Sequence, residues 1–107
     1  MENLQISIKA RAEKRNELLR TCRFVADQTR QDIGCLSCRI IQSDKDESII
    51  ILEQQWKQRS LLNEHFRSVH FSALFGALKL FSRSYEVRIN GGAPGQGMEV
   101  VQNARRR

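Results

Sequence analysis

Residues 49–52, the run Ile-Ile-Ile-Leu, constrain the fold more than any other part of the chain. A continuous apolar run bounded by polar residues is typical of a strand that is covered on both faces. A chain of 107 residues forms a single domain with one modest core, and its helices cover only one face of a sheet. We therefore expect a second copy of the chain to cover the other face, which predicts a homodimer.

Hydrophobic periodicity predicts the other elements. The expected order is strand 4–8, helix 12–31, strand 35–42, strand 49–56, helical pieces 60–67 and 70–80 with a break near Ser68, and strand 84–89. Residues 43–48 are polar and turn-forming, so the second and third strands are expected to form an antiparallel hairpin. The predicted fold class is α+β, a ferredoxin-like βαββαβ arrangement with an antiparallel sheet and both helices on one face.

The domain is expected to occupy residues 1–90, followed by a flexible linker and a short C-terminal tail helix over residues 91–107. The segment 90–97 contains four glycines and the only proline of the chain, which is typical of a flexible linker. No stretch reaches the roughly 20 apolar residues that cross a bilayer. The first residues lack the pattern of a signal peptide. We expect a cytoplasmic protein with no membrane partner.

The net charge of +6 raises the question of nucleic-acid binding. The basic residues are scattered among acidic ones, and without the three terminal arginines the charge falls to about +3, which is ordinary for a solvated surface. RNA-binding sheets with the same topology stack bases on exposed aromatic residues of the central strands, and residues 49–55 contain none. An RNA-binding sheet is therefore the less favoured interpretation, and no nucleic-acid partner is expected.

The three cysteines raise the question of redox or metal chemistry, because Cys35 and Cys38 form a CxxC pair. The pair lies in a predicted strand, where residues three apart point to opposite faces. Two thiols on opposite faces share no metal and form no easy disulfide. We therefore expect Cys22, Cys35 and Cys38 to be buried or half-buried thiols, and we expect no metal site.

A group of residues between positions 34 and 89 recurs at similar spacing in a known family. The group consists of Gly34-Cys35, Trp56, Leu62-x-x-His65, Ser68, His70-Phe71 and Glu86-Val87-Arg88. By these residues the chain resembles the antibiotic biosynthesis monooxygenase family, whose members are small dimeric α/β-barrel proteins and include quinol monooxygenases. The resemblance implies a homodimer in which two sheets face each other, with a pocket between each sheet and its helices.

The same resemblance implies an activity. Family enzymes oxidise electron-rich aromatic or quinol-type small molecules with molecular oxygen and need no cofactor. The chain departs from the family at several positions. Many members carry a glutamate two residues before the tryptophan, where this chain has Gln54. Haem-degrading members use a histidine near the position of Phe75 and an asparagine on the first strand, where this chain offers Lys9 or Arg11, so haem degradation is disfavoured.

Cofactor-free oxygenation needs a substrate that is held as its anion beside an apolar pocket. His65 is the candidate base, since an unperturbed imidazole titrates near neutral pH. Trp56 is the candidate for stacking on a flat substrate, and Arg11, Lys9 or Arg39 is the candidate for stabilising its anion. The candidate substrate-binding residues are Phe66, Phe71, Phe75 and Arg39.

Each candidate also has a purely structural interpretation. A histidine on a helix is more often a surface or capping residue, and His70 fits a helix cap or a dimer contact. Trp56 and the phenylalanines fit the hydrophobic core. The alternative function is therefore a non-catalytic homodimer that binds a small molecule.

Overall fold

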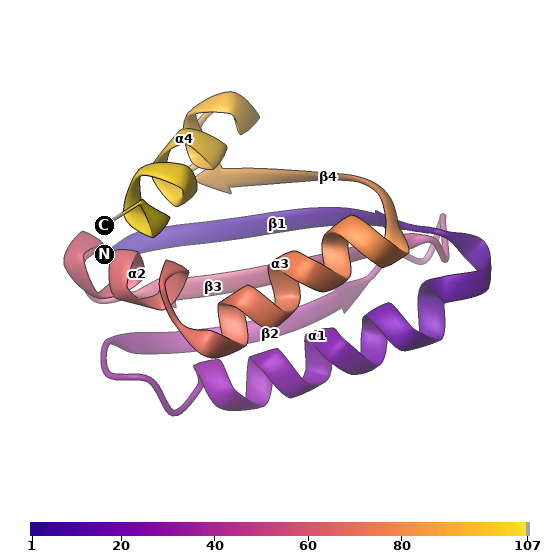
Figure 1. Cartoon of the computed structure of the whole chain (residues 1–107), viewed down its shortest axis with the longest axis horizontal. Helices are drawn as coiled ribbons and strands as arrows, with labels where there is room; N and C mark the ends of the chain where they lie inside the picture. Colours follow the sequence, from indigo (N-terminus) through magenta and orange to yellow (C-terminus); the bar gives the residue numbers. More distant parts are fainter. Residues whose placement is uncertain (107) are drawn as a thin grey trace.

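The structure, a computed structural model, describes residues 1–106 and confirms the predicted order of elements (Figure 1). These are β1 (Glu2–Ala10), the 3-10 turn η1 (Ala12–Lys14), α1 (Arg15–Thr29), β2 (Cys35–Gln42), β3 (Ile49–Trp56), α2 (Arg59–Phe66), α3 (Val69–Phe81), β4 (Ser82–Ile89) and α4 (Pro94–Arg105). The elements form the α+β, ferredoxin-like fold that the periodicity predicts.

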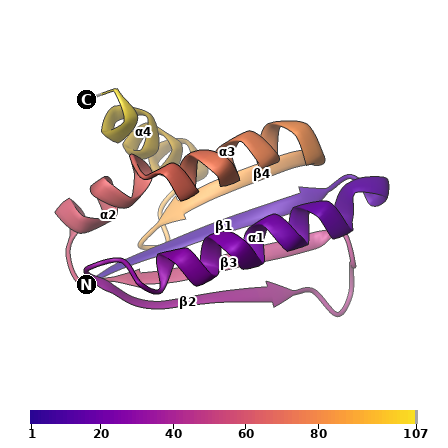
Figure 2. The same ribbon diagram turned by 60° about the horizontal axis from the view of Figure 1, so that its bottom comes forward.

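The four strands form one antiparallel sheet in the order β2-β3-β1-β4. Helices α1 and α3 lie side by side on one face of this sheet, as Figures 1 and 2 show. We call the opposite face the open face, because no helix of residues 1–106 covers it. Strand β3, which carries the isoleucine run, lies inside the sheet between β2 and β1.

Side chains of β3 alternate between the two faces of the sheet. Ile50 and Leu52 are fully buried beneath the helices, while Ile49 and Ile51 are half-buried on the open face. Within one chain the isoleucine run is thus covered on one side only, and the homodimer stays a prediction. The largest fully buried side chains are Trp56, Phe66, Phe71, Leu4, Ile6, Ile8, Leu18, Ile50, Leu52, Leu62, Leu74 and Leu78.

The prediction that Cys35 and Cys38 point to opposite faces of the sheet is wrong. The pairing of β2 with β3 shifts after Cys35, so that Leu36 has no partner on β3. Cys35 lies opposite Trp56 and Cys38 lies opposite Gln54, and these two residues share one face of β3. This β-bulge brings both thiols to the side of the sheet that the helices cover. All three cysteines are free within the described residues.

The predicted break between the two helical pieces of the second half is confirmed at Ser68. Ser68 has extended backbone dihedrals, and its hydroxyl accepts a hydrogen bond from the backbone N–H of Phe71 at 3.1 Å. A serine in this position satisfies one of the free N–H groups at the start of α3. The break allows α2 to leave the line of α3 and to contact β3, which ends at Trp56.

The C-terminal helix α4 begins at Pro94, inside the segment whose composition is typical of a linker. Proline suits the first turn of a helix because it has no N–H to satisfy. Helix α4 packs on β4 and α2 of its own chain and buries Val101 and Ala104. The last residue of the segment 91–107, Arg107, lies outside the described residues. Among residues 1–106, no helix is long and apolar enough to cross a membrane.

Candidate functional site

An aromatic cluster lies where the end of β3 meets α2 and the start of α3, and His65 is at its centre. The ring of His65 lies 4.7 Å from that of Trp56, 5.2 Å from that of Phe71 and 5.9 Å from that of Phe66, measured between ring centroids. His70 follows at 5.5 Å. His65 is only 2% exposed, so this imidazole is a core residue as well as a candidate base.

The loop between α1 and β2 closes onto this cluster because of Gly34. Gly34 has a φ of +89°, and a Cβ at this position would lie 2.3 Å from Cδ1 of Leu61 in α2. Only glycine combines this backbone conformation with so close an approach. The Gly34 carbonyl accepts a hydrogen bond from the N–H of Lys57 at 2.8 Å, which ties the loop to the end of β3. The loop thereby carries Asp32 to the two histidines.

Asp32 joins His70 and approaches His65. Oδ2 of Asp32 lies 2.8 Å from Nε2 of His70 and 3.6 Å from Nδ1 of His65. A carboxylate only accepts hydrogen bonds, so Nε2 of His70 is the donor. The distance to His65 is too long for a hydrogen bond. Both ring nitrogens of His65 are therefore buried without a hydrogen-bond partner in the part of the chain that the structure describes.

The surroundings of His65 favour its neutral form. The pKa of His65 is lowered to about 4, mainly by burial and also by the nearby His70, while Asp32 opposes both effects. A neutral imidazole presents one nitrogen with a free lone pair, which is able to accept a hydrogen bond or to bind a metal. His65 is thus neutral at pH 7, and one of its ring nitrogens is able to accept a hydrogen bond.

Gln54 holds Trp56 in place on the same face of β3. The amide oxygen of Gln54 accepts a hydrogen bond from the indole Nε1 of Trp56 at 2.9 Å, and Gln54 is itself only 2% exposed. The amide nitrogen of Gln54 is buried without a partner among the described residues. The neighbouring carboxylate, Glu53, lies on the open face and pairs there with Arg39 at 2.6 Å.

A cavity of about 360 Å³ opens beside His65 and Trp56, between the α1–β2 loop and α2. It is lined by Gln31, Asp32, Ile33, Trp56, Leu61, Glu64, His65 and Ser68. This volume is within the usual range for sites of small ligands. We call this hollow the histidine cavity.

Sequence reasoning placed seven candidate residues in the site, and the structure brings five of them together. Trp56 and His65 line the histidine cavity, while Phe66 and Phe71 are packed behind His65. Phe75 extends the cluster through a stacked contact with Phe71, at 5.8 Å between ring centroids. Phe66 and Phe71 are fully buried, so they support the site rather than line its cavity.

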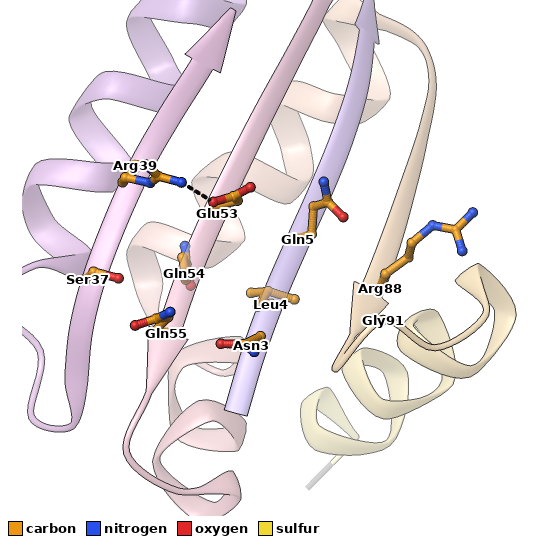
Figure 3. A pocket seen from close by; sticks show the side chains of 10 residues that line it. All are labelled: Asn3, Leu4, Gln5, Ser37, Arg39, Glu53, Gln54, Gln55, Arg88 and Gly91. Atoms are coloured by element: carbon orange, nitrogen blue, oxygen red, sulfur yellow. Dashed lines mark hydrogen bonds and ion pairs between the residues drawn. The ribbon is translucent and has the colours of Figure 1, made fainter. Parts of the chain in front are cut away.

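The two predicted arginines lie away from the histidine cavity. Arg11 follows the end of β1 that is opposite to Glu2, and Glu2 is the residue that pairs with Trp56. Arg11 therefore lies at the far end of the sheet. Arg39 lies on the open face, where it pairs with Glu53 (Figure 3).

Around Arg39, the open face has a depression of about 500 Å³ lined mostly by polar side chains. These come from all four strands and include Gln5 of β1 and Arg88 of β4 (Figure 3). The depression is separated from the histidine cavity by the sheet itself, because the cavity is lined by Trp56, whose side chain packs against His65 on the helix side of β3. It is a second hollow rather than part of the first.

Sequence reasoning missed Asp32 and the role of Gln54. Asp32 lies two residues before Gly34, and a glycine that ends a helix predicts a tight turn at which neighbouring side chains gather. Gln54 shares a strand face with Trp56, since residues two apart point the same way. Neither signal identifies a partner. The partners of Asp32 lie more than thirty residues away in the sequence, and the contact of Gln54 with Trp56 depends on the rotamers of both side chains.

Asp32, His65 and His70 also form a group with the donors of a metal site. One ligand atom from each lies within 4.8 Å of the other two. Two imidazoles and one carboxylate are ordinary ligands of Zn²⁺ and Fe²⁺. Among the described residues, the site can therefore bind a proton, a hydrogen-bond donor or a metal ion at the same place.

Comparison with solved structures identifies the fold in other organisms. A candidate antibiotic biosynthesis monooxygenase from Nitrosomonas europaea superposes with a TM-score of 0.80 at 18% identity, covering 86% of this chain and 98% of its own. One from Deinococcus radiodurans has a TM-score of 0.80 at 18% sequence identity, and the match covers 87% of this chain and 93% of that protein. A conserved protein from Methanosarcina mazei has a TM-score of 0.78 at 24% sequence identity, and the match covers 82% of this chain and 88% of that protein. At these identities the likeness shows the fold. No curated protein matches the chain significantly.

The sequence itself matches a family model. The model for the family described as antibiotic biosynthesis monooxygenase aligns with residues 1–77, from the start of β1 into α3. This span contains Asp32, Trp56, His65 and His70, and so includes the whole histidine cavity. The chain belongs to the antibiotic biosynthesis monooxygenase family.

Proposed function

We propose that the protein is a monooxygenase that oxidises a small electron-rich aromatic or quinol-type molecule with molecular oxygen, without a cofactor, in the histidine cavity. The observation that carries the proposal is His65, a neutral imidazole with two unpartnered nitrogens that lies against Trp56 at the wall of a ligand-sized hollow. Family membership supports the reaction class.

The cavity suits a flat molecule with a hydroxyl group. Trp56 and Leu61 supply apolar walls, and Glu64 and Ser68 supply polar groups at the α2 side. A hydroxyl placed at His65 would donate a hydrogen bond to the free ring nitrogen. Since a buried polar group without a partner is unfavourable by about 1–3 kcal/mol, a ligand that satisfies His65 gains both affinity and orientation.

Proton acceptance by His65 would prepare the substrate for oxygen. The imidazolium that forms lies 3.6 Å from Asp32, and the new substrate anion faces it, so both charges are compensated. An aromatic anion passes an electron to oxygen far more readily than the neutral molecule does. For a quinol, one oxygen atom is then inserted at a ring C–H to give a hydroxyquinone, and the other leaves as water with the two hydrogens that the quinol loses. The substrate supplies all the electrons.

The proposed assembly is a homodimer in which the open faces of two sheets meet. Ile49 and Ile51 are half-buried there in a single chain, together with polar side chains such as Arg39 and Glu53. Pairing two such faces would cover the isoleucines and satisfy the doubly buried pattern of residues 49–52. The helix-side histidine cavity remains accessible in this arrangement.

A non-catalytic binding protein is the second candidate. Gln54 favours it, because an amide replaces the glutamate that many relatives carry near the tryptophan, and this amide is used to hold Trp56. A binding protein would need the cavity and Trp56 but no proton acceptor.

Oxygen uptake by chelator-treated protein, measured against a panel of reduced quinols and polyphenols, tests the proposal. We expect uptake by the wild type and a loss of at least about tenfold in His65→Gln, because proton transfer by a positioned side chain contributes about 10²–10⁴-fold. Glu13→Gln, an exposed change at the far end of the sheet, is the matched control and should leave uptake unchanged.

Fluorescence of Trp56, the only tryptophan, separates the two candidates. Quenching by a quinol in both wild type and His65→Gln, with uptake in the wild type alone, supports the monooxygenase. Quenching without uptake by any variant supports the binding protein. Uptake that survives in His65→Gln removes His65 from the mechanism.

A further inference from the structure

We propose that Asp32, His65 and His70 form a binding site for one divalent transition-metal ion, of the kind that Zn²⁺ or Fe²⁺ occupies. This inference goes beyond the proposed function, since it depends on the three donor groups and not on any substrate in the histidine cavity. The site is built from the α1–β2 loop, α2 and the first turn of α3.

The donor atoms are already close to the spacing that an ion needs. Zinc lies about 2.0–2.2 Å from nitrogen and oxygen ligands, which places neighbouring ligand atoms roughly 3–4 Å apart. Oδ2 of Asp32 is 2.8 Å from Nε2 of His70 and 3.6 Å from Nδ1 of His65. All three donors lie within 4.8 Å of one another, so modest side-chain rotations would centre them on one ion.

His65 provides the independent reason to expect a ligand at this place. Its side chain is fully buried, yet neither ring nitrogen has a hydrogen-bond partner among the described residues. Burying a polar group in this way is unfavourable unless something satisfies it. A metal ion bound at Nδ1 of His65 would satisfy that nitrogen. The same ion would bind Nε2 of His70 and Oδ2 of Asp32, in place of the proton that now lies between these two atoms.

The surrounding structure resembles a metal site rather than a simple ion pair. Gly34 and Leu61 lock the Asp32 loop onto α2, so one of the three ligands is fixed by close packing. The histidine cavity borders Asp32 and His65, which leaves room for water or another ligand on the ion. Sites with three protein ligands and an open position are of the reactive kind rather than the purely structural kind.

Metal binding and proton acceptance at Nδ1 of His65 exclude each other, because the same lone pair serves both. An ion would therefore inhibit cofactor-free turnover in proportion to its occupancy. Binding itself can be measured without any substrate, so failure of the metal site and failure of the proposed function are distinguishable.

The experiment is calorimetric titration of tag-free, chelator-treated protein with Zn²⁺, together with the absorption spectrum of the Co²⁺ form. We expect one Zn²⁺ per chain and a visible Co²⁺ spectrum without the near-ultraviolet band of thiolate ligands. Asp32→Asn and His70→Gln should each weaken Zn²⁺ binding by about tenfold or more. Removing even a group that only supports a metal ligand lowers metal affinity by about 10–100-fold.

Two control variants keep the assignment specific. Glu64→Gln removes a carboxylate that lines the same cavity but is outside the group of three, and Cys35→Ser removes the half-buried thiol. Both should bind Zn²⁺ like the wild type. Circular dichroism in chelator shows whether Asp32→Asn and His70→Gln fold.

Three results would overturn the metal site. They are the absence of Zn²⁺ binding by the wild type, unchanged affinity in folded Asp32→Asn and His70→Gln, and loss of binding in Cys35→Ser. If Asp32→Asn lowers thermal stability without any wild-type metal binding, the contact between Asp32 and His70 is a structural link only.

Discussion

Gly97 sets how closely the C-terminal helix approaches the sheet, and replacing it with alanine is a sharp test of this packing. A Cβ at Gly97 would lie 2.0 Å from the carbonyl oxygen of Val87 and 2.6 Å from its carbonyl carbon. Because these are backbone atoms of β4, they cannot turn aside. An ordinary contact begins at 3.4 Å, so α4 would have to withdraw by about 1.4 Å.

The expected magnitude follows from two opposing effects. Forcing extra volume into a packed interface is unfavourable by about 1–3 kcal/mol. Alanine has a higher helix propensity than glycine, and this difference stabilises the folded state by about 0.5–1 kcal/mol. We expect Gly97→Ala to lower the free energy of unfolding by about 1–2 kcal/mol, which lowers the melting temperature by roughly 5–15 °C in a domain of this size.

Gly95→Ala is the matched control in the same helix. No heavy atom lies within 4 Å of a Cβ at Gly95, so the change should be neutral or slightly stabilising. Thermal and urea unfolding measure both variants, and hydrogen exchange over residues 94–105 shows whether α4 separates from the sheet. Equal stability of the two variants would refute the close approach of α4 to β4.

The withdrawal of α4 should also reach the candidate site. The guanidinium of Arg105 donates hydrogen bonds to the carbonyl of Phe66 at 2.8 Å and to the hydroxyl of Ser72 at 3.0 Å. These contacts tie α4 to the junction of α2 and α3, which carries both histidines. Faster exchange at residues 65–72 in Gly97→Ala would support this link.

The two faces of β3 and the three thiols give the remaining predictions. Ile51→Asp should separate the proposed homodimer into folded monomers, whereas Ile50→Asp should unfold the chain because the side chain of Ile50 is fully buried. Sedimentation measures the oligomeric state and circular dichroism measures folding. A dimeric Ile51→Asp variant contradicts the proposed interface. Burial raises the pKa of Cys22 to about 12 and that of Cys38 to about 11, and it also raises the pKa of Cys35, which is less buried. At pH 8 the native protein should therefore react slowly with a thiol reagent, first at Cys35, and all three thiols should react after unfolding; rapid reaction at Cys22 or Cys38 would show that the core opens.

The sheet and its helices were predictable because they depend on short-range patterns. The strand at residues 49–56 and the strand at residues 35–42 have the bounds that the pattern predicts. The break at Ser68 was also predictable, since a serine that caps a helix acts within three residues of itself. The glycine-rich composition of residues 94–97 predicted a flexible linker, but these residues form the first turn of α4. Gly97 is needed there for close packing against β4.

The candidate site was predictable only in part. Trp56 and His65 were found because they lie near each other in the sequence and on faces that the periodicity defines. The side of the sheet on which Cys35 lies was not predictable, since one unpaired residue, Leu36, reverses the alternation of β2. The contact of Asp32 with His70 spans 38 residues and has no local signal.

The sequence by itself determined the order of the elements and the fold class, because apolar spacing and the geometry of the backbone fix these locally. Only the tertiary structure decided that Asp32, His65 and His70 share one place, that Arg11 and Arg39 lie elsewhere, and that Gly34 and Gly97 are points of close contact. Such placements depend on which surfaces meet when the core closes, and a meeting of distant surfaces leaves no mark on the spacing of neighbouring residues.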